Sequence, residues 1–151
     1  MSISFQVEPY ASCRGDIEPH LPSHFKEIAL NQEAVPLDVD WHTYNEMADK
    51  GALHIVTARK SGALVGYIVG FVRTHPHYKS TLHTFTDIFW LHPDCRKGMT
   101  GVKLFREYER SLKARGVVKV FIASKCHLDM SPIFERLGWH RTEVVYSKVL
   151  D

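Results

Sequence analysis

An amphipathic helix that lies between two strand-like segments is the feature that most restricts the fold of this chain. Residues 101–115 carry apolar side chains at helical spacing, with Lys, Arg and Glu on the opposite face. Residues 81–91 before the helix and residues 117–123 after it are rich in β-branched and aromatic side chains, which are typical of strands. A helix in this position connects two parallel strands by a right-handed crossover, so the sequence predicts an α/β fold. The apolar face of the helix consists of Leu104, Phe105, Tyr108 and Leu112.

A predicted hairpin precedes this unit. Residues 53–59 and 64–73 are strand-like, and Lys60-Ser61-Gly62 between them is typical of a tight turn. Because hairpins join antiparallel strands, we expect a mixed sheet with helices on both faces. Residues 117–123 are apolar except for Lys119, which favours a strand buried inside the sheet. The remaining predicted elements are strands at 3–7 and 139–149, a polar loop at 74–80, and helices after Pro22, from Asp40 to about Lys50, and at 130–137.

Composition places the chain among ordinary globular proteins. Its 151 residues are 44% apolar and 24% charged, so we expect one domain, residues 1–151, with a real core. The net charge of +2 gives no general attraction to nucleic acid or to an anionic membrane, and we expect neither as a partner. The N-terminus lacks the pattern of a signal peptide, and the longest apolar stretch, residues 63–72, is too short to span a bilayer.

Cysteine usage indicates a reducing compartment. The chain has three cysteines, which are widely spaced and form no CxxC pair or disulfide framework. We therefore expect a cytoplasmic protein. The three residues are Cys13, Cys95 and Cys126.

The segment FWLHPDCRKGMTGVKLF, residues 89–105, contains the clearest chemical signal. A strand ends at a proline, a basic loop with glycines follows, and a helix begins directly after it. Unpaired amides at a helix N-terminus, beside the positive end of the helix dipole, bind anions such as pyrophosphate. The loop lacks both GxxxxGK[ST] and GxGxxG, so it is neither a P-loop nor a dinucleotide fingerprint. From the loop alone, a phosphate site and a solvated connection both remain open.

The residues PDCRKGMTGVKLF resemble the coenzyme A loop of the GNAT acyltransferase superfamily. The pattern of that loop is Arg or Gln, two residues, Gly, one residue, then Gly or Ala. Arg96 takes the first position and Gly101 the last, whereas Met99 stands where the first glycine usually lies and Gly98 comes one residue earlier. The segment IFERLGW also resembles the FYxKLGF helix end of the family. Small GNAT proteins of bacteriophages and bacteria look most similar, in HPHYKST, GVKLFREYE and FERLGW.

The resemblance implies a fold and a co-substrate. The fold is a central, mixed and mostly antiparallel sheet of six or seven strands, flanked by about four helices and splayed between its fourth and fifth strands. The co-substrate is acetyl-CoA, whose pantetheine arm lies in the splay and whose pyrophosphate rests on the loop amides. The residues implied to bind it are Phe89, Trp90, Leu91, Arg96, Lys97, Gly98, Met99, Thr100, Gly101 and Val102.

The implied reaction is transfer of an acyl group to a primary amine of a small molecule or protein. The amine attacks the thioester directly and a strand amide near Leu91 polarises the carbonyl, so no covalent enzyme intermediate is needed. A group must still take the proton of the amine. His83, Phe85 and Asp87 alternate onto one strand face, and Asp87 is our candidate for general base or amine anchor, a structural carboxylate being the alternative.

Two departures from the family pattern keep a second function open. Met99 occupies a loop glycine position, and Phe134 stands where the family often has a tyrosine that protonates the leaving thiolate. A phenyl ring cannot donate a proton. The alternative is a catalytically impaired GNAT-fold protein that binds CoA or another protein. Possible replacement proton donors are Ser131, His127, Tyr78 and Tyr146.

The acceptor, the metal content and the oligomeric state are less well determined. Residues 31–44 place Glu33, Asp38 and Asp40 beside Trp41 and Tyr44, which suits a cationic amine, although we favour a solvated acidic loop with Trp41 packed in the core. A homodimer is possible, because the last strand could pair across an interface. We expect no metal site, since the only histidine cluster has no supporting Cys pair or HExxH motif. That cluster is His75, His77 and His83.

Overall fold

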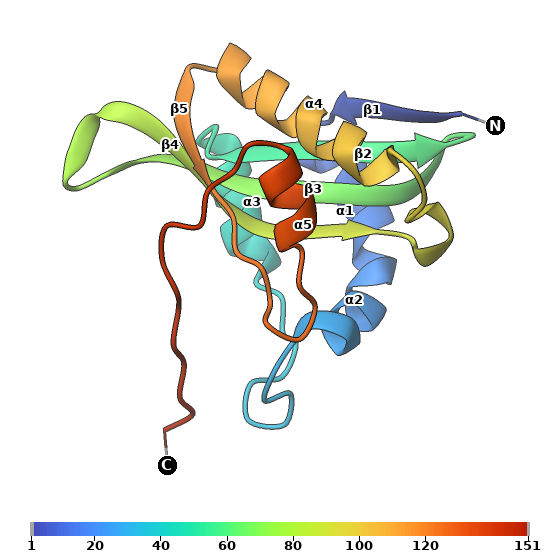
Figure 1. The fold of residues 1–151 in the computed structure, drawn as a ribbon, viewed down its shortest axis with the longest axis horizontal. Helices are drawn as coiled ribbons and strands as arrows, with labels where there is room; N and C mark the ends of the chain where they lie inside the picture. The colour runs from blue at the N-terminus through green and yellow to red at the C-terminus, as the bar shows by residue number, and fades with distance from the viewer. Residues whose placement is uncertain (1, 151) are drawn as a thin grey trace.

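The computed structural model describes residues 2–150 and contains one curved five-stranded sheet between two helical layers (Figure 1). The strand order is β1-β2-β3-β4-β5, in which β1 to β4 pair antiparallel and β5 pairs parallel to β4. In chain order the elements are β1 (Ile3–Val7), α1 (Tyr10–Ile17), η1 (Glu18–His20), α2 (Leu21–Ile28), α3 (Trp41–Asp49), β2 (Leu53–Lys60), β3 (Ala63–His75), β4 (Tyr78–Leu91), η2 (Pro93–Cys95), α4 (Thr100–Ala114), β5 (Val117–Phe121) and α5 (Ser131–Arg136).

Each face of the sheet carries its own core. On one face, α4 and α5 pack against β1 to β4, and Tyr108 and Leu112 of α4 are fully buried there. On the other face, α1, η1, α2 and α3 cover a second cluster centred on Tyr67 of β3 and Trp90 of β4. Burying apolar side chains on both faces is the main stabilising contribution in such a fold. β4 is therefore covered by helices on both sides. Among residues 2–150, no helix is long and apolar enough to cross a membrane.

Local chemistry explains the elements that the sequence predicts well. Asp40 caps α3, since its Oδ1 accepts from the amide of Thr43 at 2.9 Å. The turn between β2 and β3 has Ser61 at φ 52° and Gly62 at φ 82°, the two left-handed residues that a tight hairpin turn of matching twist requires. The hairpin, α3, α4 and α5 are thus confirmed within a residue or two.

A bulge in β4 determines which way Asp87 points. Thr86 pairs with Gly70 and Ile88 pairs with Val69, so Asp87 is an extra residue between two pairs. A bulge of this kind turns two successive side chains to one face. Thr86 accordingly contacts α4, whereas both Asp87 and Ile88 face α1 to α3.

The strand count and several segments differ from the sequence predictions. The described sheet has five strands, not six or seven, because residues 139–149 form no strand. Residues 117–123 are not an interior strand: β5 lies at the sheet edge and Val118 is 65% exposed. Residues 74–80 extend β3 and β4 to a tight turn, and α1, a helix of low amphipathicity, was not predicted.

Candidate active site

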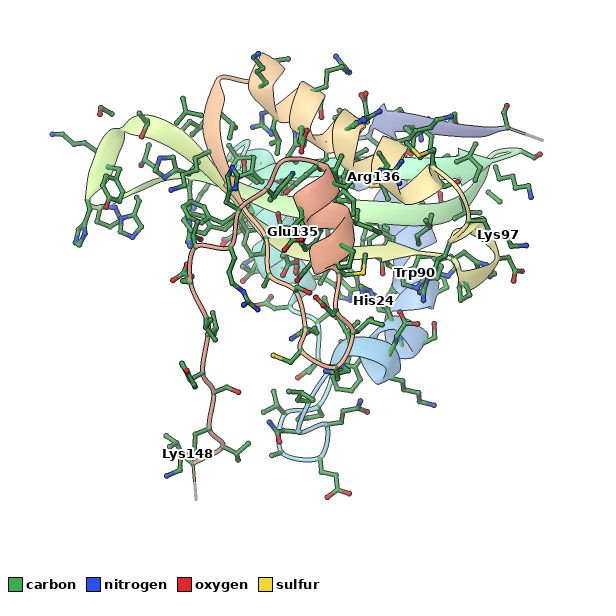
Figure 2. The ribbon with its side chains drawn as sticks, in the orientation of Figure 1. His24, Trp90, Lys97, Glu135, Arg136 and Lys148 are labelled. Carbon is green, nitrogen blue, oxygen red and sulfur yellow. The ribbon has the colours of Figure 1, made fainter. Side chains whose placement is uncertain are left out.

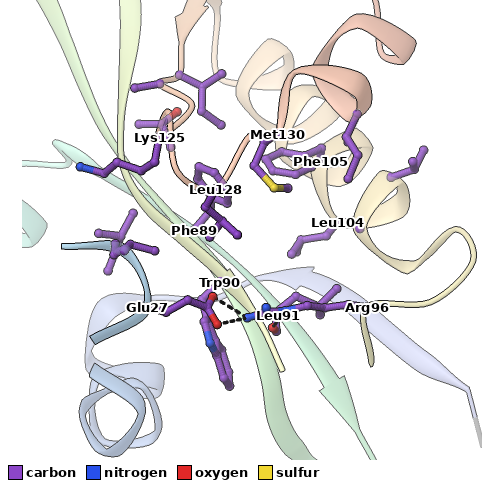
Figure 3. A pocket seen from close by; sticks show the side chains of 18 of the residues that line it. Glu27, Phe89, Trp90, Leu91, Arg96, Leu104, Phe105, Lys125, Leu128 and Met130 are labelled. Atoms are coloured by element: carbon purple, nitrogen blue, oxygen red, sulfur yellow. Dashed lines mark hydrogen bonds and ion pairs between the residues drawn. The ribbon is translucent and has the colours of Figure 1, made fainter. Parts of the chain in front are cut away.

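The site is a cavity where β4 and β5 separate. The parallel pairing joins residues 82–85 to residues 117–121 and stops there, while β4 continues to Leu91. A cavity of about 440 Å³ opens beyond the last pair, between β4, the start of α4 and the chain that follows β5 (Figure 3). The splay expected between the fourth and fifth strands is therefore present.

The structure gathers most of the sequence-predicted site residues around this cavity. Eight of them line its wall: Asp87, Phe89, Trp90, Leu91, Arg96, Gly98, Gly101 and Val102. Lys97, Met99 and Thr100 lie in the same loop and first helical turn, but they are not part of the wall. Together with Glu27 of α2 and residues within 122–136, the eight wall residues form one lining, which is mainly apolar along β4.

The start of α4 supplies free amides at the mouth of the cavity. The amide of Thr100 donates to Lys97 O at 3.4 Å and that of Lys103 donates to Met99 O at 2.8 Å, whereas the amides of Gly101 and Val102 between them lack helical partners. Gly98 has φ 57°, a conformation that favours glycine and that turns the chain into the helix. The glycine one residue early therefore still serves the turn, although Met99 takes the usual glycine position.

Two arginines add positive charge near these amides, and a lysine adds charge on the opposite side of the cavity (Figure 3). Arg96, Arg136 and Lys125 all line the cavity, and Arg136 donates to the sulfur of Met99 at 3.5 Å. Arg96 also pairs with Glu27 of α2, with Nη2 2.8 Å from Oε1. Both side chains of this pair are about one-third exposed, so water screens it and it can exchange partners.

Arg96 also shows which way the strand backbone points. Its Nε donates to the carbonyl oxygen of Leu91 at 2.7 Å, on the side of β4 away from β3 (Figure 3). The N–H and C=O of one strand residue point the same way, so the amide of Leu91 also faces the open edge. Donors on this edge are available to a ligand in the cavity.

Asp87 and Glu27 are the two carboxylates on the cavity wall, and Asp87 is the one that β4 carries. It is half-buried and accepts a short hydrogen bond from the hydroxyl of Tyr44 in α3. Burial raises the pKa of Asp87 above its ordinary value, and the Tyr44 hydrogen bond partly opposes that shift. Burial, and then the nearby Asp87 charge, raises the pKa of Tyr44 well above its usual range, so the tyrosine stays a neutral donor.

A buried histidine supports the β4 wall from below. His24 of α2 is 2% exposed, and its Nδ1 lies 2.8 Å from the hydroxyl of Tyr67 (Figure 2 shows His24 below Trp90). Burial lowers the pKa of His24 to about 4, so its ring is neutral near pH 7. The ring of Trp90 lies 6.5 Å from it, which makes His24 part of the packing behind the cavity.

Phe134 lies in an aromatic cluster and carries no proton to donate. Its ring centroid is 5.4 Å from that of Phe105 and 5.9 Å from that of Phe89. None of the four alternative donors is on the cavity wall. Ser131 contacts Asp129, and the Nε2 atom of His127 lies 3.4 Å from Glu27 O. Tyr78 is the first residue of β4 and pairs with His75, and Tyr146 is 91% exposed in the C-terminal segment.

Several residues of the site were missed by sequence reasoning. Glu27 and Thr86 line the cavity, as do the cations Lys125 and Arg136, and Tyr44 was expected only as an aromatic wall for the amine. Of these residues, only Thr86 could have been suspected from the sequence, because it directly precedes the candidate base Asp87. In residues 2–150, no group of three or more His, Cys, Asp and Glu is arranged to hold a metal ion.

Comparison with known proteins identifies the family. A family model described as the acetyltransferase (GNAT) family matches residues 20–139, which is most of the chain. The chain belongs to the GNAT acetyltransferase family. It is therefore an N-acetyltransferase by family, with acetyl-CoA as co-substrate. A search of curated proteins finds no match.

Solved GNAT structures share the fold over the whole length. A predicted acetyltransferase from Clostridium acetobutylicum with acetyl-CoA has a TM-score of 0.74 at 12% identity, covering 98% of this chain and 96% of that one. A ribosomal-protein-alanine N-acetyltransferase from Brucella melitensis biovar Abortus 2308 has a TM-score of 0.75 at 16% identity, covering 100% and 99%. Glucosamine-6-phosphate N-acetyltransferase from Arabidopsis thaliana has a TM-score of 0.72 at 11% identity, covering both chains fully. At these identities the likeness shows the fold alone.

Proposed function

We propose that this GNAT protein transfers an acyl group, in the simplest case acetyl, from acyl-CoA to a primary amine of a small molecule or protein. The observation that carries the proposal is a buried carboxylate, Asp87, on the wall of a cavity whose mouth is a helix N-terminus flanked by cations. Such a mouth suits a pyrophosphate, and such a carboxylate suits proton removal from an amine.

The residues at the start of α4 would hold the phosphates of the co-substrate. The amides of Gly101 and Val102 in the first helical turn have no helical partner, Arg96 and Arg136 line the cavity beside this turn, and Lys97 lies in the loop before it. Glu27 opposes this charge, so phosphate binding requires Arg96 to exchange its carboxylate partner for a phosphate oxygen.

The open edge of β4 would hold and orient the pantetheine arm. Phe89, Trp90 and Leu91 line the cavity beyond the last β4–β5 pair, and a volume of about 440 Å³ falls in the range of small-molecule sites. The amide of Leu91 faces this edge and would polarise the thioester carbonyl. One fixed donor of this kind typically contributes about 10²–10³ in kcat.

Asp87 would take the proton from the attacking amine. A general base works best when its pKa lies near the operating pH, and burial raises the pKa of Asp87 toward that pH. Tyr44 positions the carboxylate by donating to one of its oxygens, which leaves the other oxygen for the amine. The leaving thiolate needs no acid, because a thiol pKa near 8.5 makes it a moderate leaving group.

A second candidate is a GNAT-fold protein that binds CoA or another protein without turnover. The observation that favours it is Phe134, which is 8% exposed and packed in an aromatic cluster where no proton donor replaces it. This candidate predicts coenzyme binding with no acetylation of any amine.

The first experiment measures coenzyme binding by isothermal titration calorimetry. We expect micromolar affinity of the wild type for acetyl-CoA and loss of binding in an Arg96→Ala, Gly101→Glu double variant, which removes a cation and places a carboxylate among the helix amides. The exposed Lys113→Ala variant, at the far end of α4, is the control and should bind as the wild type does. A folded wild type without affinity for acetyl-CoA would refute the proposal.

The second experiment measures turnover on an amine panel. The panel contains an aminoglycoside, an amino sugar phosphate and a peptide with N-terminal alanine, and thiol release is followed with each. We expect Asp87→Asn to lose about 10²–10⁴ in kcat/KM while binding acetyl-CoA normally. Tight binding with no release on any amine would select the non-catalytic candidate instead.

Other expectations from the sequence remain predictions. They are one domain spanning residues 1–151, a cytoplasmic location, the absence of a nucleic-acid partner and a homodimer. All three cysteines are free, and Cys126 is exposed, which is compatible with a reducing compartment.

A further inference from the structure

A second cavity adjoins the Asp87–Tyr44 pair. Its volume is about 130 Å³, and it lies between α1, α3 and the sheet. Tyr44 lines this second cavity and donates a hydrogen bond to Asp87, which lines the first cavity. Ile88 lines both cavities. The candidate base therefore lies where the two cavities meet.

The bulge in β4 turns the residues at this junction to one face of the sheet. Asp87 and Ile88 are successive residues that both face α1 to α3, because Asp87 is the extra residue of the bulge. An amine whose nitrogen lies against Asp87 can therefore extend its substituent along Ile88 into the second cavity. The acyl group, by contrast, would arrive with the coenzyme from the first cavity, where the open edge of β4 lies.

The second cavity is lined almost entirely by apolar side chains. Ten of its eleven described lining residues are aliphatic or aromatic. The sheet contributes Ile55 and Val69, which are both buried, and α3 contributes the neighbouring rings of Trp41 and Tyr44. An apolar cavity of about 150 Å³ excludes water and binds a ligand of the size of benzene. The second cavity thus fits one phenyl ring or one branched alkyl group.

The loop before α3 contributes apolar side chains to this cavity and keeps its carboxylates out of it. Of the described residues of the loop, Leu37 and Val39 line the cavity, whereas Glu33, Asp38 and Asp40 do not. The carboxylate of Asp40 is occupied as the cap of α3, where its two oxygens accept from the amide and the hydroxyl of Thr43. Leu37 is 41% exposed, so a ligand in the cavity would cover apolar surface that is otherwise in water.

The one charged side chain among the described residues of this lining is a cation. The guanidinium carbon of Arg14 lies 4.4 Å from the ring centroid of Trp41, and Arg14 Nη2 is 3.8 Å from Glu18 Oε2. The ion pair is long, and both of its side chains are exposed, so it neutralises little of the Arg14 charge. A second ammonium group on the acceptor would meet this positive charge in the cavity, which disfavours polyamines.

We propose that the acceptor is a primary monoamine with an aryl or branched alkyl group, which the second cavity binds, and that polycationic amines are rejected; this inference rests on the proposed acyltransferase function. The amine nitrogen would lie between Asp87 and the thioester, with its apolar group beside Ile88 and Trp41. A bond then forms from the nitrogen to the carbonyl carbon and the C–S bond breaks. Asp87 takes the proton of the amine, and coenzyme A leaves as a thiolate that is protonated by water.

The first test measures amine binding without turnover, by nuclear magnetic resonance of the full chain. Phenethylamine or ethanolamine is added in the presence of free coenzyme A, which has no acyl group to transfer. We expect phenethylamine to shift the indole signal of Trp41 and to bind about tenfold or more tightly than ethanolamine. Val39→Phe, which fills the cavity from the loop, should abolish the shift, and Val35→Phe, at a position 61% exposed on the same loop, is the matched control. Equal affinities for the two amines, or a bound phenyl ring without Overhauser contacts to Ile55 and Val69, would overturn the proposal.

The second test measures turnover of acetyl-CoA with three amines. We expect kcat/KM for phenethylamine to exceed that for ethanolamine by about tenfold or more, and the diamine putrescine to be a poor acceptor. Arg14→Gln should raise the ratio of kcat/KM for putrescine to that for phenethylamine roughly threefold, because it removes one like charge from the cavity. Arg106→Gln, at an exposed position of α4 on the other face of the sheet, should leave this ratio unchanged.

The two tests together separate this inference from the function on which it rests. Phenethylamine binding at Trp41 with no turnover of any amine would support the amine site and refute acyl transfer. Similar turnover of all three amines would support acyl transfer and overturn the inference. A Val39→Phe protein that loses turnover of butyryl-CoA but keeps that of acetyl-CoA would also overturn it, because the second cavity would then hold the acyl chain. Circular dichroism checks that each variant is folded.

Discussion

At the scale of single residues, the contact between Tyr44 and Asp87 sets the chemistry of the cavity. Burial raises the pKa of the Asp87 carboxyl, whereas the hydrogen bond from Tyr44 stabilises the ionised form and lowers it. The two effects together keep the carboxylate basic enough to take a proton and acidic enough to be ionised. Tyr44 is therefore a positioning residue with a defined effect on the pH profile.

Tyr44→Phe is expected to move the acid limb of kcat/KM to higher pH. Asp87 must be deprotonated to act as a base, so activity rises as the pH passes its pKa, and loss of the Tyr44 hydroxyl raises that pKa. A hydrogen bond to a charged group contributes about 1.5–3 kcal/mol, which corresponds to a shift of roughly 1–2 pH units. The measurement is kcat/KM from pH 5 to pH 9 beside the exposed Tyr78→Phe control, which should not shift. An equal loss at every pH would contradict the assigned role.

Residue contacts across long stretches of sequence were the part of the site that the sequence could not predict. Asp87 and the basic loop at Arg96 are visible because a strand, a loop and a helix follow one another directly. Tyr44 and Glu27 reach these residues only through the packing of α2 and α3 on the sheet, from 43 and 69 positions away. No pattern within a short window encodes contacts of that kind.

At the scale of elements, β3 and α4 approach each other at a glycine. A Cβ atom at Gly70 would lie against the hydroxyl of Tyr108 and 2.7 Å from Thr84 Cγ2, closer than side-chain atoms pack. The Tyr108 hydroxyl also bonds Thr86 at 3.0 Å, directly before the Asp87 bulge. The glycine therefore allows the helix to sit close to the strand that carries the site.

Gly70→Ala is expected to lower the free energy of unfolding by about 1–3 kcal/mol, the usual cost of overpacking. Urea denaturation followed by circular dichroism gives this value. Gly15→Ala is the matched control, because Gly15 lies inside α1 with open space around its Cβ position. It should raise stability by roughly 0.5–1 kcal/mol through helix propensity. A Gly70→Ala protein as stable as the wild type would mean that α4 shifts freely on the sheet.

Two buried histidines, one under each helical layer, make the fold sensitive to acid. Burial lowers the pKa of both His24 and His54 to about 4, and Arg115 adds to the shift at His54. In the unfolded chain each titrates near pH 6.5. The unfolded state thus binds protons that the folded state excludes, so stability is full above pH 6.5 and falls as the pH drops toward 4. With both groups titrating, the maximum slope is about 2–3 kcal/mol per pH unit.

His54→Gln is expected to remove about half of this slope between pH 6.5 and 4.5. The Gln side chain can still reach Ser111, whose hydroxyl lies 2.7 Å from His54 Nε2, so the packing should be retained. Urea midpoints across the pH range measure the slope, and His77→Gln, at an exposed position in the β3–β4 turn, should leave it unchanged. A slope unaffected by His54→Gln would mean that carboxylates dominate the acid response.

Elements were predictable where their determinants are local and were missed where they are not. The turn at Gly62, the cap at Asp40 and the apolar face of α4 are encoded within a few residues, and each was predicted. A strand requires a partner strand as well as β propensity. Residues 139–149 have the propensity and were predicted as a strand, but they pair with no strand of the sheet. The family pattern gave the β4–β5 splay, but only the strand register locates the bulge at Asp87.

At the scale of the whole molecule, the proposed coenzyme site joins parts of the fold that otherwise touch little. The cavity wall is built from α2, β4, the start of α4, and the segment from β5 to α5. β5 pairs with β4 over only a few residues, so the wall after Phe121 is held mainly by side chains. A ligand that fills the cavity contacts all four parts at once, and its binding free energy adds directly to the stability of the folded state.

Acetyl-CoA is therefore expected to raise the thermal midpoint of the full chain. At a hundred times its dissociation constant, a ligand that binds only the folded state contributes about 2.7 kcal/mol, which raises the melting temperature of a protein of this length by roughly 5–10 °C. Differential scanning calorimetry measures the shift, with free acetate as a negative control. The Arg96→Ala, Gly101→Glu variant should melt at the same temperature with and without acetyl-CoA. If acetyl-CoA stabilised the variant as strongly as the wild type, the coenzyme would have to bind away from the start of α4. Among residues 2–150, no other cluster of free helix amides adjoins this cavity.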